Sequence, residues 1–248
     1  MKVVLLLAGL GRRLGNITRK HNKCLIELNN KPLLGHLLDG LIFNNLHDII
    51  PIVGHDGNSI IKYLNDNYAG KIECNPAINS EYKKTNNMYS LWCARQQLDG
   101  KPFILCNGDS IIDKRIIKRL VDSSGESEIV LDVQNRHKAI DSPGTILRDK
   151  RILDLGRHIP LSENGGYAIG LYKYGKDLST AYFGEVEKML GQDMLQAGFH
   201  DPLLPLLSAF NVQKVSTGGL LWTDIDTAED IPKANKICSM IMGVREGS

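Results

Sequence analysis

The fold is decided at residues 3–13, which read Val3-Val4-Leu5-Leu6-Leu7-Ala8-Gly9-Leu10-Gly11-Arg12-Arg13. A continuous apolar run of this length is typical of a central parallel strand that is buried on both faces. The glycines that follow let backbone amides surround an anion, and guanidinium groups donate paired hydrogen bonds to phosphate oxygens. The stretch therefore predicts a buried first strand that leads into a nucleotide-phosphate loop.

Other readings of this loop make different demands on the sequence. A dinucleotide fingerprint would need glycine at Leu14, but the glycine comes one place later, at Gly15. This spacing argues against a dinucleotide-dependent oxidoreductase. A P-loop would need Gly-Lys-Ser/Thr, which the stretch lacks. A glycine-rich turn with two solvated arginines remains the plainest alternative.

Strands and helices are predicted to alternate downstream of this loop as far as about residue 120. The alternation indicates a parallel sheet with right-handed crossovers. Apolar periodicity, caps and prolines predict an extended piece at 24–26, helices at 32–43, 59–67 and 86–97, and strands at 48–53, 71–74 and 102–106.

From residue 128 onward the pattern changes to short strands with short turns, which indicates mixed or antiparallel pairing. We expect one α/β domain over 1–248, with a nucleotide-binding part at 1–120 and an acceptor-binding part with a closing helix at 121–248. The expected fold class is α/β, with a Rossmann-like mixed but mostly parallel sheet flanked by helices and a small β-meander insertion. Its later strands are expected at 129–133, 145–148, 152–155, 167–172 and 213–215, and its later helices at 178–190 and 228–240.

Composition excludes several classes of protein. Apolar residues make up 42% of the 248 residues, and the 30 basic and 28 acidic side chains give a net charge of +2. This balance favours neither nucleic acid nor a membrane surface as partner. Five cysteines without CxxC spacing favour a reducing cytoplasm, and the apolar opening is too short to span a bilayer. The sequence is compatible with a homodimer.

Two acidic positions could bind a metal ion. Asp109 follows an apolar strand, at the sheet edge where ligands usually bind, and Asp224 and Asp226 precede the last helix. Mg²⁺ takes one or two carboxylates together with phosphate oxygens and water. The alternative is a turn aspartate at 109 and an acidic helix start at 226–230.

The N-terminal residues also carry a family pattern. Segments 7–14 (LAGLGRRL) and 30–34 (NKPLL), with Lys23 between them, resemble the signature of nucleotidyltransferases that make NDP-sugars and related activated alcohols. The resemblance implies that the loop holds a triphosphate. Leucine, arginine and asparagine replace the family's Ala, Ser/Thr and Pro at positions 7, 12 and 22. The implied catalytic residues are Arg13 and Lys23, and the implied nucleotide contacts include Leu7, Ala8, Gly9, Gly11 and Arg12.

Three further segments narrow the resemblance to the cytidylyltransferases. Residues 107–109 (NGD) resemble the family's G-D metal motif, and 222–230 (WTDIDTAED) are similar to the W-x-D-[VI]-D-T-x-E-D segment of inositol-phosphate cytidylyltransferases. Residues 82–92 (YKKTNNMYSLW) resemble the N-N-x-Y-S-L segment of phosphocholine cytidylyltransferases. The resemblance implies Mg²⁺ on Asp109 with Asp224 or Asp226, and nucleotide contacts from Asn87, Ser90 and Asn107. Asn86 as a helix cap and the aromatic residues as packing are the structural alternatives.

The resemblance gives less detail for the acceptor. Arg157 and the segment 164–170 (NGGYAIG) look like acceptor-side positions, although many relatives have Gly-Glu-Tyr where this chain has Tyr167-Ala168. Tyr89, Tyr167, Tyr172 and Trp222 could surround a quaternary ammonium, or they could belong to the core. The implied reaction is Mg²⁺-dependent transfer of CMP from CTP to a small phosphorylated or phosphonylated acceptor. A sugar-1-phosphate nucleotidyltransferase that uses UTP or another nucleotide and a non-catalytic nucleotide-binding homologue are the alternatives.

Overall fold

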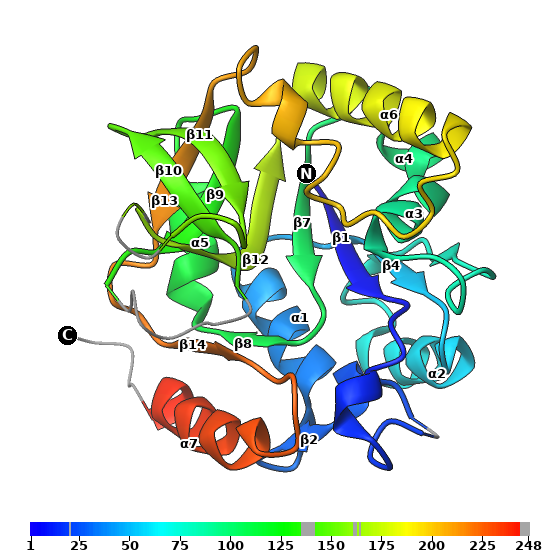
Figure 1. The fold of residues 1–248 in the computed structure, drawn as a ribbon. Helices are drawn as coiled ribbons and strands as arrows, with labels where there is room; N and C mark the ends of the chain where they lie inside the picture. Colours follow the sequence, from blue (N-terminus) through cyan, green and yellow to red (C-terminus); the bar gives the residue numbers. More distant parts are fainter. Residues whose placement is uncertain (20, 135–141, 161–162, 164, 244–248) are drawn as a thin grey trace.

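One mixed sheet runs through the molecule (Figure 1) in the order β10-β11-β13-β9-β12-β7-β1-β4-β5, with β6 also paired to β4. The computed structural model describes residues 1–19, 21–134, 142–160, 163 and 165–243. The strands are β1 (Lys2–Leu7), β4 (Asp48–Val53), β5 (Glu73–Cys74), β6 (Ala77–Ile78), β7 (Phe103–Asn107), β9 (Ser127–Asp132), β10 (Gly144–Arg148), β11 (Arg151–Gly156), β12 (Tyr167–Tyr174) and β13 (Val212–Ser216).

Parallel pairing is concentrated in the N-terminal part of the sheet. There β1 lies parallel to both β4 and β7. Further along, β12 is antiparallel to β7 and β9, and β13 is parallel to β9. The sheet is therefore mixed rather than mostly parallel, and the expected meander is an antiparallel hairpin of β10 and β11 at one edge of the same sheet.

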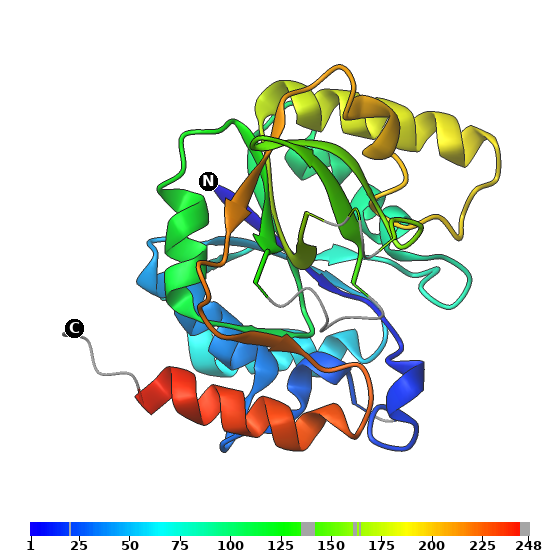
Figure 2. The same cartoon turned by 60° about the vertical axis from the view of Figure 1, so that its left-hand side comes forward.

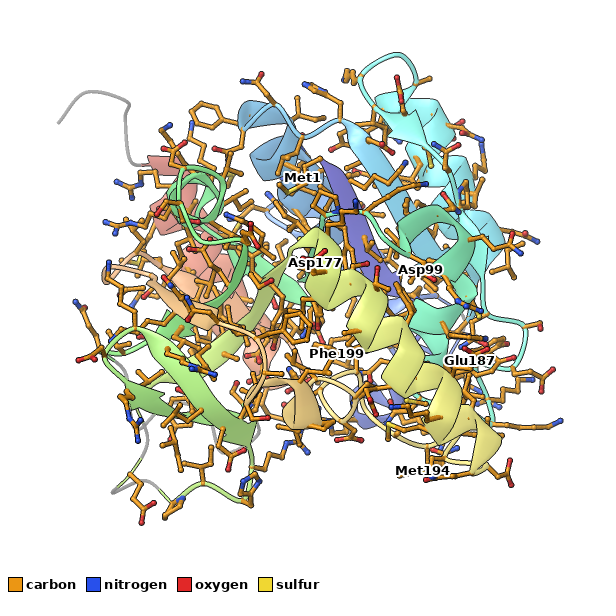
Figure 3. All side chains as sticks on the ribbon, turned by 90° about the horizontal axis from the view of Figure 1, so that it is seen from above. Met1, Asp99, Asp177, Glu187, Met194 and Phe199 are labelled. Carbon is orange, nitrogen blue, oxygen red and sulfur yellow. The ribbon has the colours of Figure 1, made fainter. Side chains whose placement is uncertain are left out.

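Helices cover both faces of the sheet, and the alternation of side chains along β1 explains the two cores. Val4 packs in the core beneath α3 (Asn87–Cys93), α4 (Arg95–Leu98) and α6 (Lys176–Gly191). Val3 and Leu5 face the opposite core, formed with α1 (Leu33–Phe43), α2 (Gly57–Tyr68) and α5 (Lys114–Val121). Figure 3 looks down on α6, and Figure 2 shows the layers from the side.

A two-stranded ribbon outside the main sheet holds the second acidic segment. β14 (Trp222–Asp224) pairs antiparallel with β8 (Ser110–Ile112), so that Asp224 lies opposite Ser110. The last helix, α7 (Asp230–Gly243), packs beside this ribbon and against β2 (Glu27–Leu28), which pairs with β3 (Lys31–Pro32). This ribbon was not among the expected elements. It joins two segments that are more than a hundred residues apart in the chain.

Most expected elements are present, with three differences. The extended piece expected at 24–26 is wrong, because residues Lys23–Leu25 form a 3₁₀ helix, η2, whose first turn is capped by the side chain of Asn22. The helix expected at 86–97 is interrupted at Ala94, between α3 and α4. Pro32 precedes α1 rather than opening it. The expected cap is confirmed, since the Asn86 side chain accepts a hydrogen bond from the backbone N–H of Asn87. Within the described residues, no helix has the length and apolar character needed to cross a membrane.

Candidate active site

The glycine-rich loop after β1 is held in one conformation by local contacts. Gly11 adopts a left-handed backbone with φ of 60°, which residues other than glycine rarely adopt. The Thr18 hydroxyl donates to the Gly11 carbonyl at 2.8 Å. The loop then turns into the 3₁₀ helix η1 (Arg12–Leu14), which carries both arginines. The backbone at this strand end is thus shaped before any ligand is bound.

Asn22 ties this loop to the segment that carries Lys23. Its Nδ2 donates to the carbonyls of Leu7 at 2.7 Å and His55 at 2.9 Å, and more weakly to that of Gly9 at 3.3 Å. Its Oδ1 accepts from the backbone N–H of Cys24 at 3.1 Å. No motif in the sequence predicts a role for Asn22, yet this side chain fixes the backbone at the place where the family pattern has proline.

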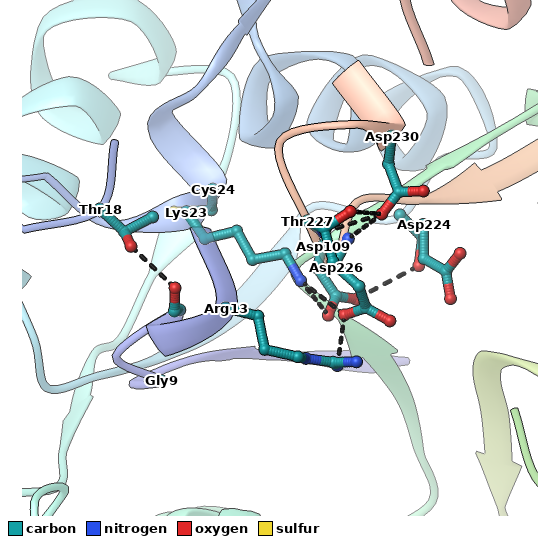
Figure 4. Close-up of polar contacts among 12 residues, drawn as sticks. Gly9, Arg13, Thr18, Lys23, Cys24, Asp109, Asp224, Asp226, Thr227 and Asp230 are labelled. Atoms are coloured by element: carbon teal, nitrogen blue, oxygen red, sulfur yellow. Dashed lines mark hydrogen bonds and ion pairs between the residues drawn. The ribbon is translucent and has the colours of Figure 1, made fainter. Parts of the chain in front are cut away.

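Four charged side chains meet beside the loop (Figure 4). The Lys23 ammonium lies 3.1 Å from Asp109 Oδ2 and 3.0 Å from Asp226 Oδ1. The Arg13 guanidinium contacts the same Asp226 oxygen at 2.8 Å. We call Arg13, Lys23, Asp109 and Asp226 the charged cluster. Of the two acidic candidates that the sequence left open, Asp226 lies in this cluster and Asp224 lies beside it.

The backbone explains why two distant aspartates meet. Asp109 follows β7, and its carbonyl accepts from the backbone N–H of Ile225 at 3.0 Å. The Asp230 carboxylate, at the start of α7, accepts from the backbone N–H groups of Asp226 at 2.9 Å and Thr227 at 2.8 Å. The β8–β14 ribbon and the first turn of α7 therefore direct the Asp226 side chain toward Lys23.

Glycines let the strand ends approach each other closely. A Cβ atom on Gly108 would lie 2.7 Å from the carbonyl oxygen of Leu6, so only glycine fits between β7 and β1 here. Gly170 in β12 has φ of 83°, and a Cβ atom there would lie 2.7 Å from Asn107 Nδ2. These two positions set where Asn107 and Asp109 emerge from the sheet.

The protonation of the cluster follows from burial and charge. Burial lowers the pKa of Lys23, but the charges of Asp109 and Asp226 and the hydrogen bonds to both outweigh it, so the pKa is raised. Lys23 is therefore a cation at neutral pH. Burial, followed by the charges of Asp109 and Asp226, raises the pKa of Asp224 to about 6. Negative charge is thus in excess on this side of the cluster.

The acidic residues suit a hard divalent cation that is shared with a ligand. Among the described residues, no group of three His, Cys, Asp or Glu side chains could hold a metal ion alone. Asp109 and Asp226 already converge on one cation, the Lys23 ammonium. Mg²⁺ is commonly held by one or two carboxylates with phosphate oxygens and water completing the shell. The two carboxylates give this ion an incomplete set of ligands, which phosphate oxygens would complete.

Three adjoining cavities meet at Asp109. The first, of about 410 Å³, lies between the glycine-rich loop and the start of α3. The second, of about 370 Å³, contains Arg13, Lys23 and Asp226. The third, of about 550 Å³, extends under β11 and β12 as far as the loop after α6. Asp109 lines all three, so a ligand that crosses from one cavity to the next passes this carboxylate.

The cavities collect most of the residues that the sequence singled out. Asn87, however, uses its Oδ1 to accept from the backbone N–H of Phe199 at 2.8 Å, so it also holds the loop after α6. The first cavity is lined by Ala8, Gly9, Gly11, Arg12, Asn87, Ser90 and Asn107. The second shares Gly9, Gly11 and Arg12 with it and adds Leu7, Arg13 and Lys23, whereas the third shares Asn87 and Asn107 with the first and adds Arg157, Asp224 and Asp226.

The expected aromatic box does not form. Among the described residues, Tyr89, Tyr167 and Trp222 line none of the three cavities. Trp222 is buried and its indole N–H donates to Asp132 at 2.8 Å, while Tyr167 is buried in β12 opposite the same Asp132. Sequence position alone did not separate core aromatics from cavity aromatics. Asn164, part of the expected acceptor segment, lies outside the described residues.

Aromatic side chains do line the third cavity, but only one of them belongs to the expected set within the described residues. Tyr172 in β12 lies there, with Phe199 and His200 from the loop after α6. The Tyr172 hydroxyl is 2.7 Å from His200 Nε2. Burial, followed by the charge of Arg157, lowers the pKa of His200 to about 3, so this ring is neutral at physiological pH. Tyr172 was the only member of the expected box that the cavity contains within the described residues.

The chain is similar to several known proteins. The CMP-5'-(3-aminopropyl)phosphonate synthase of Streptomyces rubellomurinus is 29% identical to this chain. The matched part covers 60% of this chain and 23% of that protein. The CTP:phosphoglutamine cytidylyltransferase of Campylobacter jejuni is 24% identical over 93% of this chain and 98% of its own length. The inositol-1-phosphate CTP transferase of T. maritima shares the fold, with a TM-score of 0.83, 16% identity, and coverage of 99% of this chain and 98% of its own. Residues 3–204 match the MobA-like NTP transferase domain, so the chain belongs to that family and is a nucleotidyltransferase.

Proposed function

We propose that the chain transfers CMP from CTP to a small acceptor that bears a phosphate or phosphonate, and releases pyrophosphate. One observation carries this proposal: the charged cluster lies where three cavities meet. The first cavity has room for a nucleoside, the second holds the cations for a triphosphate, and the third adjoins both at Asp109. Cytidine as the nucleoside and a phosphorylated acceptor are favoured by the names of the relatives described above.

In this reaction an oxygen of the acceptor attacks the α-phosphorus of CTP in line. A bond forms between that oxygen and phosphorus, and the bond from phosphorus to the oxygen that bridges to the β-phosphorus breaks. Pyrophosphate leaves with the electron pair. The attacking phosphate oxygen is already deprotonated near neutral pH, so no general base is required. Positioning and charge neutralisation are the tasks left to the protein.

Arg13 and Lys23 would neutralise the triphosphate. Both side chains now contact Asp226, and Lys23 also contacts Asp109. On nucleotide binding they would exchange carboxylate oxygens for phosphate oxygens. Asp109 and Asp226 would then be released to hold Mg²⁺, which supplies Lewis-acid stabilisation of the charge on the phosphates. Arg157, in the third cavity, is placed to meet the anionic group of the acceptor.

A pyrophosphate-release assay tests the proposal. CTP, UTP, ATP and GTP are each combined with phosphocholine, aminoethylphosphonate, inositol phosphate and sugar phosphates, with Mg²⁺ or with EDTA. We expect release with CTP, with one of the first three acceptors, and only when Mg²⁺ is present. Release with a sugar phosphate and UTP would contradict the proposal. Absence of release with every pair would contradict it too.

A further inference from the structure

A buried asparagine stands directly behind the wall of the first cavity. Asn79 follows β6 and is only 1% exposed. Its Nδ2 donates to the hydroxyl of Thr85 at 3.1 Å and to that of Ser90 at 3.0 Å. Thr85 and Ser90 both line the cavity, whereas Asn79 itself does not. No motif in the sequence predicts a role for this residue.

The orientation of the Asn79 amide is set by chemistry. Its Oδ1 lies 2.9 Å from the backbone N–H of Glu81, which can only donate a hydrogen bond. The oxygen must therefore face Glu81, and the NH₂ group must face the two hydroxyls. The Asn79 backbone is also held, because its N–H donates to the carbonyl of Val53 at 2.9 Å. Ser90 and Thr85 thus each accept one hydrogen bond from Asn79.

The two hydroxyl protons are then in different situations. Thr85 donates its proton to the Glu81 carbonyl at 2.9 Å. The acceptor that the structure gives Ser90 among the described residues is the Asn86 carbonyl, at 3.4 Å. This bond is longer, and therefore weaker, than the one that the Thr85 hydroxyl makes to Glu81. The Ser90 proton is therefore the one that can turn toward a ligand in the first cavity, which makes Ser90 a hydrogen-bond donor there.

We propose that Asn79 sets the choice between cytosine and uracil by fixing Ser90 as a donor to ring atom N3 of the base. N3 is an acceptor in cytosine, whereas in uracil it carries a proton. Uracil would require the Ser90 proton to return to the long bond with the Asn86 carbonyl. This inference rests on the proposed function, because it places the base in the first cavity. Asn79 is a positioning residue, since it acts through Ser90.

The replacement Asn79→Asp reverses this polarity with almost no change in shape. The carboxylate still accepts from Glu81, but it now accepts from Ser90 as well, so that the lone pairs of Ser90 face the cavity. We expect the ratio of kcat/KM for CTP over UTP to fall by about tenfold, the effect of one hydrogen bond lost and one gained. The change should lie mainly in KM, and kcat/KM for UTP should rise. Assays at pH 8.5 favour the ionised carboxylate.

Two more variants complete the test. Ser90→Ala should lower the CTP-to-UTP ratio by reducing kcat/KM for CTP, with little change for UTP, and it decides the matter if Asn79→Asp does not fold. Asn67→Asp adds the same charge on the exposed end of α2 and should leave the ratio unchanged. A ratio that stays within twofold of the parent value in folded Asn79→Asp, or in Ser90→Ala, would overturn the inference. So would a parent protein without a preference for CTP over UTP. If the parent protein turns over none of the nucleotides, that result counts against the proposed function instead. The CTP-to-UTP ratio of each variant would then be taken from binding affinities measured by calorimetry.

Discussion

Two lysines of this molecule form ion pairs that are largely shielded from solvent, and they differ in what surrounds them. Lys173 and Glu128 form an ion pair of 2.7 Å, with side chains 8% and 4% exposed, and Lys173 also donates to the carbonyl and hydroxyl of Ser123. The Lys23 ammonium also contacts carboxylate oxygens, at 3.1 Å from Asp109 and 3.0 Å from Asp226, but Lys23 lines a cavity. The first lysine has its donors satisfied inside the core. The second holds carboxylates that a ligand can reach, so the same pairing is structural in one place and exchangeable in the other.

Removing the buried lysine gives the largest expected change in stability. Lys173→Met would leave Glu128 charged and buried without its cation, and should lower the free energy of unfolding by about 3–5 kcal/mol. Urea denaturation measures this loss, while kcat of the folded fraction should be unchanged. The matched control is Lys62→Met, whose exposed pair with Asp66 contributes less than about 1 kcal/mol. Equal losses in the two variants would show that the buried ion pair contributes no more to the free energy of unfolding than the exposed one.

Breaking the charged cluster should act on turnover instead. We expect Asp109→Asn and Lys23→Met each to lower kcat roughly a hundred- to a thousandfold, because charge stabilisation on the phosphates is lost. The melting temperature of Asp109→Asn should stay close to that of the parent, since Lys23 keeps its contact with Asp226. Lys23→Met should melt lower, because Asp109 then loses the cation that it contacts in the charged cluster. Steady-state kinetics and thermal melts on the same preparations check both parts. Near-normal turnover in either variant would refute the role assigned to that residue.

The raised pKa of Asp224 predicts a pH-dependent stability. The pKa of Asp224 is raised from 3.8 to about 6 in the folded protein, so folding favours the protonated carboxyl. The contribution of Asp224 to the free energy of unfolding is therefore full below about pH 4 and is lost as pH rises through 6. The loss is at most about 3 kcal/mol. In EDTA, Asp224→Asn should therefore melt above the parent at pH 8, and the gap should close toward pH 4. A gap that does not depend on pH would show that burial and the neighbouring carboxylates do not raise the pKa of Asp224.

The smallest expected effect is on metal affinity, and it tests whether a metal ion can replace the Lys23 ammonium at the two carboxylates. In the absence of nucleotide, the Lys23 ammonium competes with a metal ion for Asp109 and Asp226. Lys23→Met should raise the affinity for Mn²⁺ roughly tenfold, or about 1.4 kcal/mol, although the same variant turns over poorly. Electron paramagnetic resonance of free Mn²⁺ measures the affinity, with Lys62→Met as control. An unchanged or weaker affinity would show that the ammonium does not occupy the metal position.

Local patterns predicted much of this fold. Apolar runs located β1, β4 and β7, and Asn86 marked the start of α3. The β8–β14 ribbon escaped prediction because its strands are three residues each and its partners are distant in the chain. The 3₁₀ turn at Lys23 also escaped, since it depends on how one Asn22 side chain folds back on the glycine-rich loop.

Site residues that belong to a sequence motif could be predicted, whereas residues whose role depends on tertiary packing could not. The family pattern indicated Arg13, Lys23 and Asp109, which the fold brings together. The acceptor aromatics could not be chosen from the sequence, because a tryptophan such as Trp222 satisfies its N–H in the core as readily as at a ligand. Asn79 carried no signal at all. Its importance comes only from the direction in which its amide points.

The Asn22 contacts have a consequence for the speed of nucleotide capture. One amide joins the end of β1, the glycine-rich loop and the end of β4, so these backbone segments are ordered as soon as the chain folds. A ligand that binds to a preorganised loop does not pay the entropic cost of ordering that loop. We therefore expect triphosphate association to be limited by diffusion and by the departure of two cations from their carboxylates, rather than by rearrangement of the loop.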